Sequence, residues 1–404
     1  MRVSMAVPAL PRPARPAWFL LAFALANMGG VIAYLPLLTL LLPLKIHAIA
    51  GDARIPLLSL TAILGALAAS AANIVFGWLS DRSVARGGGR RRWVAGGLVT
   101  TAASYALVAS ASTAVTIVAA VVLFQVAVNA VLAPLLPIMA DEVPDAHKGL
   151  AAGLIALGNP VAALLSAVLV ADEGLADATR LAVVPLLAAL ALLPLLLLRG
   201  DGGADGTAPA TAPLLPRRDL LIAAVARLLM QLATAALSLY LLYVFESIAP
   251  GERQLVLARQ VGTLLTICYV IPLPLALLVG RWSDRVGRRQ PFLVAAGLVA
   301  VAGLGTMALA AGTTAAAIGF ATYSVGSAVF LALHSAFALQ LLPDPRRRGR
   351  DLGLLNLTNT LPALLGPLLT WTLATPRDFA LLLTVLAVLT ALGTGAVTLV
   401  RARR

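Results

Sequence analysis

Long apolar runs separated by short polar connectors dominate this sequence. Apolar stretches of about 20 residues recur along the whole chain, and that is the length a helix needs to cross a bilayer core roughly 30 Å thick. Cutting the sequence at charges and at Gly/Pro clusters predicts an all-α polytopic membrane protein with twelve spans: Trp18–Leu42, Ile55–Leu79, Trp93–Ala111, Thr113–Met139, Leu150–Ala171, Thr179–Leu198, Leu220–Phe245, Val256–Val279, Phe292–Ala311, Thr314–Leu342, Leu352–Leu373 and Phe379–Val400.

One long polar segment divides these spans into two sets of six. Residues 199–219 read "RGDGGADGTAPATAPLLPRRD" and carry no periodic apolar face, which is typical of a flexible linker. The predicted organisation is therefore a tail (1–17), a six-helix bundle (18–198), the linker (199–219), a second six-helix bundle (220–400) and a short tail (401–404).

Composition and charge agree with this class and set an orientation. Hydrophobic residues make up 60% of the chain, and its mean hydropathy is +0.96. Of the 30 Lys and Arg residues, 23 fall on the side that holds both termini, six fall on the other side, and Arg227 lies inside a span. By the positive-inside rule both termini are cytoplasmic. The net charge of +13 is thus a topology signal, and we expect no nucleic-acid partner.

The two halves repeat a charged motif. The stretch "GWLSDR" at Gly77–Arg82 returns as "GRWSDRVGRR" at Gly280–Arg289, at an offset of 203 residues. Further on, "KGLAAGLIALGNP" from Lys148 returns as "RGRDLGLLNLTNT" from Arg348, at an offset of 200 residues. An insertion of three residues within "ARGGGRRR" would account for the change in offset.

This motif resembles the signature loop of the major facilitator superfamily, the twelve-helix secondary transporters. The resemblance implies two pseudo-symmetric six-helix bundles around a central cavity, which open alternately to the two sides. It also implies that Asp81 lies near Arg348–Asp351 and Asp284 near Lys148–Leu150. Small residues there would let helix ends approach closely. The predicted gating residues are Gly77, Asp81, Arg82, Lys148, Gly280, Asp284, Arg285, Gly287, Arg288 and Arg348.

Polar residues inside the spans are candidates for the substrate path, because such residues are costly in a membrane. On the seventh span, Arg227, Gln231, Thr234 and Ser238 share one helical face. The full candidate set is Asn27, Tyr34, Gln125, Asn129, Arg227, Gln231, Tyr240, Tyr323, His334, Asn356 and Asn359. For any one of them, an interhelical hydrogen bond worth about 0.6 kcal/mol is an equally good interpretation.

Two residues are candidates for ion coupling. His334 is the histidine that lies within a span, and histidine titrates near neutral pH. Glu246 is the acid nearest to a span interior, close to the predicted outer interface. Because the spans otherwise lack a carboxylate, proton coupling, sodium coupling and uniport all remain open; we expect no cofactor and no metal.

The sequence favours a secondary transporter of a small organic solute over an enzyme. It contains no H-E-x-x-H, G-x-S-x-G or phosphate-binding loop. The connectors "PIMADEVPDAHKG" and "LLPDPRRRGRDLG" resemble those of glycoside-type facilitators, and this resemblance implies a sugar or glycoside-like solute. If Arg227 faces the central cavity, an anionic solute would suit it instead. Alternatives are a drug or metabolite efflux antiporter and a non-transporting receptor. We expect a monomer in the inner (plasma) membrane of a bacterium, with lipid and solute as its partners.

Overall fold

The computed structural model describes residues 17–142, 154–172, 174–198, 217–340 and 348–400, and these residues are helical almost throughout. The N-half holds α1 (Ala17–Ile32), the π-helix η1 (Leu37–Leu41), α2 (Leu42–Ala50), the 3₁₀ turn η2 (Gly51–Ala53), α3 (Arg54–Ala85), α4 (Arg91–Ser110), α5 (Ala114–Glu142), α7 (Gly158–Ala171) and α8 (Asp177–Leu197). The C-half holds α9 (Arg217–Ile248), α10 (Gln254–Val270), α11 (Pro272–Val286), α12 (Gln290–Ala308), α13 (Thr313–Gln340), α14 (Arg348–Leu373) and α15 (Ala380–Thr398).

Length and composition make these helices membrane spans. Within the described residues, ten helical stretches are long and apolar enough to cross a bilayer, and Thr360–Leu373 is a shorter apolar helix. The first stretch, Trp18–Ala85, contains 68 residues and holds two of the predicted spans. The predicted all-helical polytopic membrane protein is therefore confirmed.

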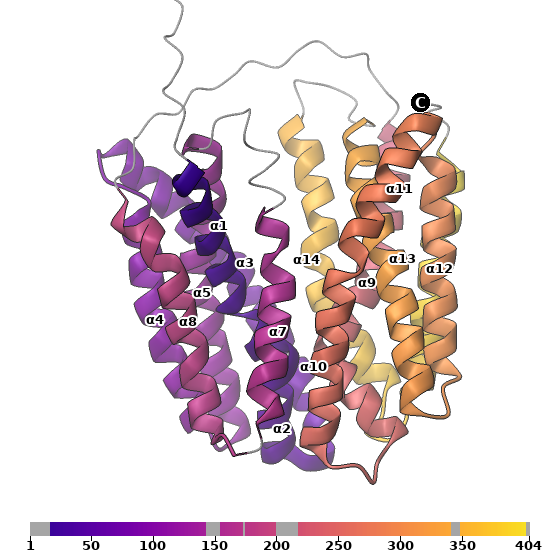
Figure 1. The fold of residues 1–404 in the computed structure, drawn as a ribbon, viewed down its shortest axis with the longest axis horizontal. Coiled ribbons are helices and arrows are strands. Elements are labelled where there is room, and N and C mark those ends of the chain that lie inside the picture. Colours follow the sequence, from indigo (N-terminus) through magenta and orange to yellow (C-terminus); the bar gives the residue numbers. More distant parts are fainter. Residues whose placement is uncertain (1–16, 143–153, 173, 199–216, 341–347, 401–404) are drawn as a thin grey trace, which may run out of the picture.

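The two halves lie side by side as separate bundles (Figure 1), and they meet through a few helices. The main contacts between them are α7 against α10 and α3 against α14. We call the end with the connectors Arg86–Arg90 and Gly287–Arg289 the connector end. The opposite end, with Gly51–Ala53 and Ala249–Arg253, is the far end. The connector end is at the top of Figure 1 and the far end at the bottom.

Both halves repeat one packing scheme. Helix α4 packs on α5 and α8, and α12 packs correspondingly on α13 and α15. Small residues allow these approaches: a methyl group at Gly97 would lie 2.7 Å from the Val131 backbone, and one at Gly326 would overlap the Ala300 backbone. Close backbone approach through small residues is the usual way in which membrane helices associate.

The connector after the second span is longer in the N-half than in the C-half. Arg90 and Arg289 are the N-cap residues of α4 and α12. They follow Asp81 and Asp284 by nine and five residues, respectively. Measured from the acid to the helix start, the N-half is thus four residues longer, within one residue of the predicted insertion of three.

One span in each half is interrupted. In the N-half, α1 ends at Ile32 and the chain continues through a turn and Pro36 into the π-helix η1. In the C-half, α10 ends at Val270 and α11 begins at Pro272. Proline lacks the N–H that a helix needs, so it frees a carbonyl of the preceding turn. Within the N-half, the Tyr105 hydroxyl donates a hydrogen bond at 3.0 Å to the carbonyl of Ala33, which lies in the turn before Pro36.

Candidate functional site

A tyrosine from each half lies beside these interruptions. Tyr34 lies in the turn between α1 and η1, and Tyr269 is the last residue but one of α10. Their phenol groups are within electrostatic range of each other, and Ser238 of α9 lies near the Tyr269 hydroxyl. Both tyrosines are only partly buried. Irregular backbone at membrane depth is tolerated where it lines a cavity or lies within protein, and transporters often bind solute at such breaks.

Two further tyrosines join the halves on the far side of this pair, and both are buried. Tyr240 of α9 forms a hydrogen bond with Ser59 of α3. One turn further along α9, the Tyr243 hydroxyl donates to the Pro43 carbonyl of α2 at 2.8 Å. These bonds place the tyrosines of α9 in the contact between the halves.

A buried charge cluster lies beyond these tyrosines at the far end. Glu246 of α9 presents its Oε2 to Arg54 Nε at 3.3 Å and to His47 Nδ1 at 3.4 Å. Gln254 donates its Nε2–H to Glu246 Oε1 at 2.9 Å. Arg54 and Glu246 have side chains that are only 10% and 8% exposed. Because Arg54 and His47 belong to the N-half, the Glu246 carboxylate connects the two halves.

The acids at the connector end are arranged differently. Asp81 pairs with Arg90, and Asp284 accepts a hydrogen bond from Arg289 Nη2 at 2.8 Å, so each pair stays within its own half. Both carboxylates are largely exposed, at 65% and 61%.

The glycines of the repeated motif make no close helix contact with the residues that the structure describes. A methyl group at Gly77 or Gly280 would meet none of their atoms within 4 Å. The predicted partners at Lys148–Leu150 and Arg348–Asp351 lie outside the described side chains, so this close approach stays a prediction.

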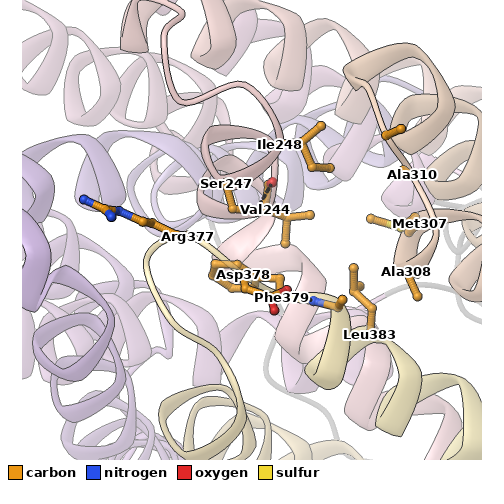
Figure 2. A pocket seen from close by; sticks show the side chains of 12 residues that line it. Val244, Ser247, Ile248, Met307, Ala308, Ala310, Arg377, Asp378, Phe379 and Leu383 are labelled. Atoms are coloured by element: carbon orange, nitrogen blue, oxygen red, sulfur yellow. Dashed lines mark hydrogen bonds between the residues drawn. The ribbon is translucent and has the colours of Figure 1, made fainter.

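A separate pocket of 280 Å³ opens at the far end of the C-half (Figure 2). It lies between the end of α9, the α12–α13 connector and the start of α15. Figure 2 shows Arg377 directed away from the other lining side chains. Since residues of the C-half line this pocket, it is not part of a path between the halves.

One protein-family profile matches this chain in two segments, which correspond approximately to its two halves. The profile described as the Major Facilitator Superfamily matches residues 17–256 and again residues 220–404. The chain belongs to this superfamily. It is therefore a multi-pass membrane transporter and not an enzyme. None of the curated proteins matches the sequence.

Several solved structures of transporters share the fold. A bacterial homologue of the human lysosomal transporter Spinster, inward-facing and occupied, has a TM-score of 0.69 at 14% identity, over 96% of this chain and 95% of that one. A mutant of the nucleoside transporter NupG gives 0.72 at 12% identity, over 95% and 100%. A bacterial metal transporter gives 0.65 at 15% identity, over 95% and 98%. At these identities the likeness concerns the fold.

The predicted gate partners of this superfamily member fall outside the described side chains. Lys148 lies in the segment 143–153, outside the described residues, and Arg348 begins α14 but its side chain is likewise not described. Arg82 stacks on Trp78 of its own helix at 5.1 Å, and Arg285, Gly287 and Arg288 are exposed. The proximity of Asp81 to Arg348 and of Asp284 to Lys148 therefore stays a prediction.

Several predicted path residues make hydrogen bonds within one half. In the N-half, Asn129 of α5 accepts a bond from Asn73 of α3 at 3.3 Å and donates to the Gln125 carbonyl at 2.8 Å. Asn27 donates to the Phe23 carbonyl of its own helix at 3.0 Å. These contacts are compatible with two roles for the residues: hydrogen bonds within or between helices, and solute binding.

The C-half shows the same pattern between α9 and α13. Arg227 donates to Ser335 Oγ at 3.0 Å, and Thr234 shares a hydrogen bond of 2.7 Å with Tyr323. Gln231 is partly buried one turn beyond Arg227. Asn356 and Asn359 lie on α14, but their side chains are not described.

His334 is packed inside the C-half. It is 0% exposed, its Nε2 lies 2.8 Å from the Ala223 carbonyl of α9, and its ring contacts Phe330 and Phe337. This environment favours a structural role in the α9–α13 contact. Glu246, the second candidate for coupling, belongs to the far-end charge cluster.

Sequence reasoning missed Tyr269, Arg54 and Ser59. The signal for Tyr269 was present: it precedes Pro272 by three residues, much as Tyr34 precedes Pro36 by two. In the sequence, Arg54 contributed only to the count of basic residues on the outer side. No sequence feature indicates that Ser59 contacts Tyr240.

Proposed function

We propose that this transporter carries a small polyhydroxylated solute, a sugar or a glycoside-like compound, by alternating access. The observation that carries the proposal is the position of Tyr34 and Tyr269, one in each half, each beside an interrupted span and within electrostatic range of the other. A site shared by both halves can change its contacts when one half rocks against the other, which is what alternating access requires.

The chemistry of the pair suits such a solute. A phenol offers an apolar ring and a hydroxyl that both donates and accepts, and a sugar offers an apolar C–H face bordered by hydroxyl groups. Ser238, near Tyr269, and Asn27, on the helix that ends just before Tyr34, add neutral polar groups. Neutral donors and acceptors match hydroxyl groups without burying an unpaired charge.

The two ends of the molecule support the alternation. At the far end the halves are joined by Tyr240, Tyr243 and Glu246. At the connector end Asp81 and Asp284 are exposed and bonded within their own halves. This arrangement corresponds to one side closed and the other side parted, and transport requires a second state in which these roles are exchanged.

The test is flux into liposomes that contain the purified protein. We expect saturable uptake and counterflow of a radiolabelled sugar or glycoside from a panel of such compounds. Tyr269→Phe and Tyr34→Phe should each lower affinity about tenfold, because each removes one hydroxyl contact worth about 1–1.5 kcal/mol. Thr306→Val is the control: Thr306 is exposed on α12 and bonds its own helix at Ala302, so flux should not change.

Other outcomes would replace the proposal. Counterflow of lipophilic cations with no sugar flux would establish the efflux alternative, and ligand binding without any flux would establish a receptor. Sugar flux that both tyrosine variants leave unchanged would remove the Tyr34–Tyr269 pair from the site.

A further inference from the structure

We propose that Glu246 is the centre of a latch that holds the far ends of the two halves together, and that uptake of a proton by His47 strengthens it. The latch consists of His47, Arg54, Glu246 and Gln254. This inference rests on the proposed alternation of the two halves. It states that these charged residues control whether the far end is closed or open.

Arg54 is the main contact of the N-half. Its Nε faces Glu246 Oε2 at 3.3 Å, and its Nη2 donates to the Pro376 carbonyl at 3.2 Å. Glu246 and Pro376 both belong to the C-half. The guanidinium also lies over the Tyr243 ring, 5.2 Å from its centre. One buried cation thus makes three contacts to the other half, and opening the far end would break all of them.

The Glu246 carboxylate is shared between the halves. Oε1 accepts a hydrogen bond from Gln254 of its own half, whereas Oε2 faces Arg54 and His47. Arg54 Nε, His47 Nδ1 and Glu246 Oε2 are buried and lack an aligned hydrogen bond within the described residues. Their attraction is therefore mainly between charges, and it depends on the charge of the imidazole.

Histidine is the side chain whose charge changes between about pH 5 and 8. His47 Nδ1 lies 3.4 Å from Glu246 Oε2, and the side chain is 35% exposed, so protons can reach it from the far end. A protonated imidazole adds a positive charge next to the carboxylate, and the neutral ring lacks this charge in either tautomer. Far-end closure should accordingly strengthen as the pH falls.

The other charged groups around the latch do not substitute for these residues. Asp52 of η2 lies 3.9 Å from Arg54 Nη1 and is 96% exposed. Lys45 of α2 donates to the Ala109 carbonyl at 2.9 Å. Asp378 accepts a hydrogen bond from the Ala380 N–H. Arg253 and Arg377, on the two C-half connectors, are exposed.

Distances between spin labels test the latch without any solute. Cys268 is the one cysteine of the chain and is buried, so labels are attached in a Cys268→Ala background. Ser112→Cys and Ala311→Cys report the far end, and Ala85→Cys with Val286→Cys report the connector end; all four positions are exposed. The labelled pairs are measured by pulsed electron paramagnetic resonance in liposomes.

Glu246→Gln keeps the shape of the side chain and removes its charge. We expect the ratio of far-end-open to far-end-closed protein to rise at least tenfold, while the connector-end distance shortens. Glu252→Gln is the matched control, since Glu252 is exposed six residues away, and it should change neither distance. Equal effects of the two variants, or no effect of Glu246→Gln, would overturn the latch.

The proton is tested in a weakened latch, where both states are populated. In Arg54→Gln, lowering the pH from 8 to 6 should raise the far-end-closed fraction several-fold, and adding His47→Gln should abolish that dependence. A pH dependence that survives His47→Gln, or none in Arg54→Gln, would refute the role of His47.

A charge exchange separates a latch from a merely structural role. Arg54→Glu combined with Glu246→Arg should recover at least part of the closure lost in either single variant. The distances are measured without solute, so the two proposals can fail independently. Sugar flux without the expected distance changes would refute the latch alone, and the expected distance changes without sugar flux would refute the proposed solute alone.

Discussion

The two ends of the molecule use charge in opposite ways. At the far end, Glu246 and Arg54 are buried and join different halves. At the connector end, Asp81 and Asp284 are exposed and join residues of one half. A buried pair is costly to break, because separation leaves an uncompensated charge, whereas an exposed pair contributes little. Among the described residues, the charged contacts at the far end join the two halves, and those of Asp81 and Asp284 at the connector end stay within one half.

A second contrast lies within the connector end, where the halves repeat one contact with different chemistry. In the N-half, Arg91 at the start of α4 donates to the Leu195 carbonyl of α8 at 2.9 Å. In the C-half, Gln290 at the start of α12 donates to the Val397 carbonyl of α15 at 2.8 Å. Arg91 additionally forms a two-pronged ion pair with Glu142, at 2.7 and 2.8 Å. The N-half is thus clamped internally by charge.

The largest effect should come from breaking this internal clamp. Glu142→Gln leaves the Arg91 guanidinium buried, with a side chain only 13% exposed, and without its counter-charge. We expect the free energy of unfolding to fall by about 3–5 kcal/mol. Gln290 is the C-half residue at the position of Arg91. Gln290→Ala removes a neutral hydrogen bond and should lower the free energy of unfolding by about 0.5–1.5 kcal/mol. Denaturant titration of the detergent-solubilised protein measures both.

The same variants test the contrast between the ends. If the clamp acts within the N-half, Glu142→Gln should leave the far-end distance unchanged while it lowers stability. A shift of the far-end distance as large as that of Glu246→Gln would show that the connector-end charges also control the contact between the halves.

A smaller effect is expected for the neutral bond that crosses between the halves. Tyr240→Phe removes the hydroxyl bonded to Ser59 and keeps the ring. Hydrogen bonds between membrane helices contribute about 0.6 kcal/mol on average, so the far-end-open population should rise about threefold. Ser59→Ala should have a similar effect, and the double variant should add little to either one. Fully additive effects in this cycle would mean that the two hydroxyls do not act as a pair.

Much of the fold could be predicted from the sequence, because apolar runs and connector charges are local properties. The two bundles, the helix ends at Ser110 and Ala114 and the repeated acidic motif all follow from residues close together in the chain. The extension of the first span through α2 to Ala50 was missed, because Lys45 and His47 resemble a connector. There they are accommodated by the Ala109 carbonyl and by Glu246.

The site was less predictable, because its contacts join residues far apart in sequence. Tyr240 and Glu246 were recognised as polar residues of the seventh span, but their partners Ser59 and Arg54 lie in the other half of the chain. Polarity inside a span indicates that a partner exists, and it does not say whether the partner is a solute or another helix. His334 illustrates the second case, since the Ala223 carbonyl occupies its Nε2.

The smallest effect on stability is expected at the repeated acids of the connector end. Asp81→Asn and Asp284→Asn weaken exposed pairs with Arg90 and Arg289, and such pairs contribute about 0–1 kcal/mol after solvent screening. Neither variant should measurably change unfolding in the far-end-closed arrangement. Their effect should appear in transport, because the predicted partners of these acids lie in the opposite half and can be reached only when the connector end closes. If the variant that combines Asp81→Asn and Asp284→Asn transports solute and populates both states like the unmodified protein, the two acids have no gating role.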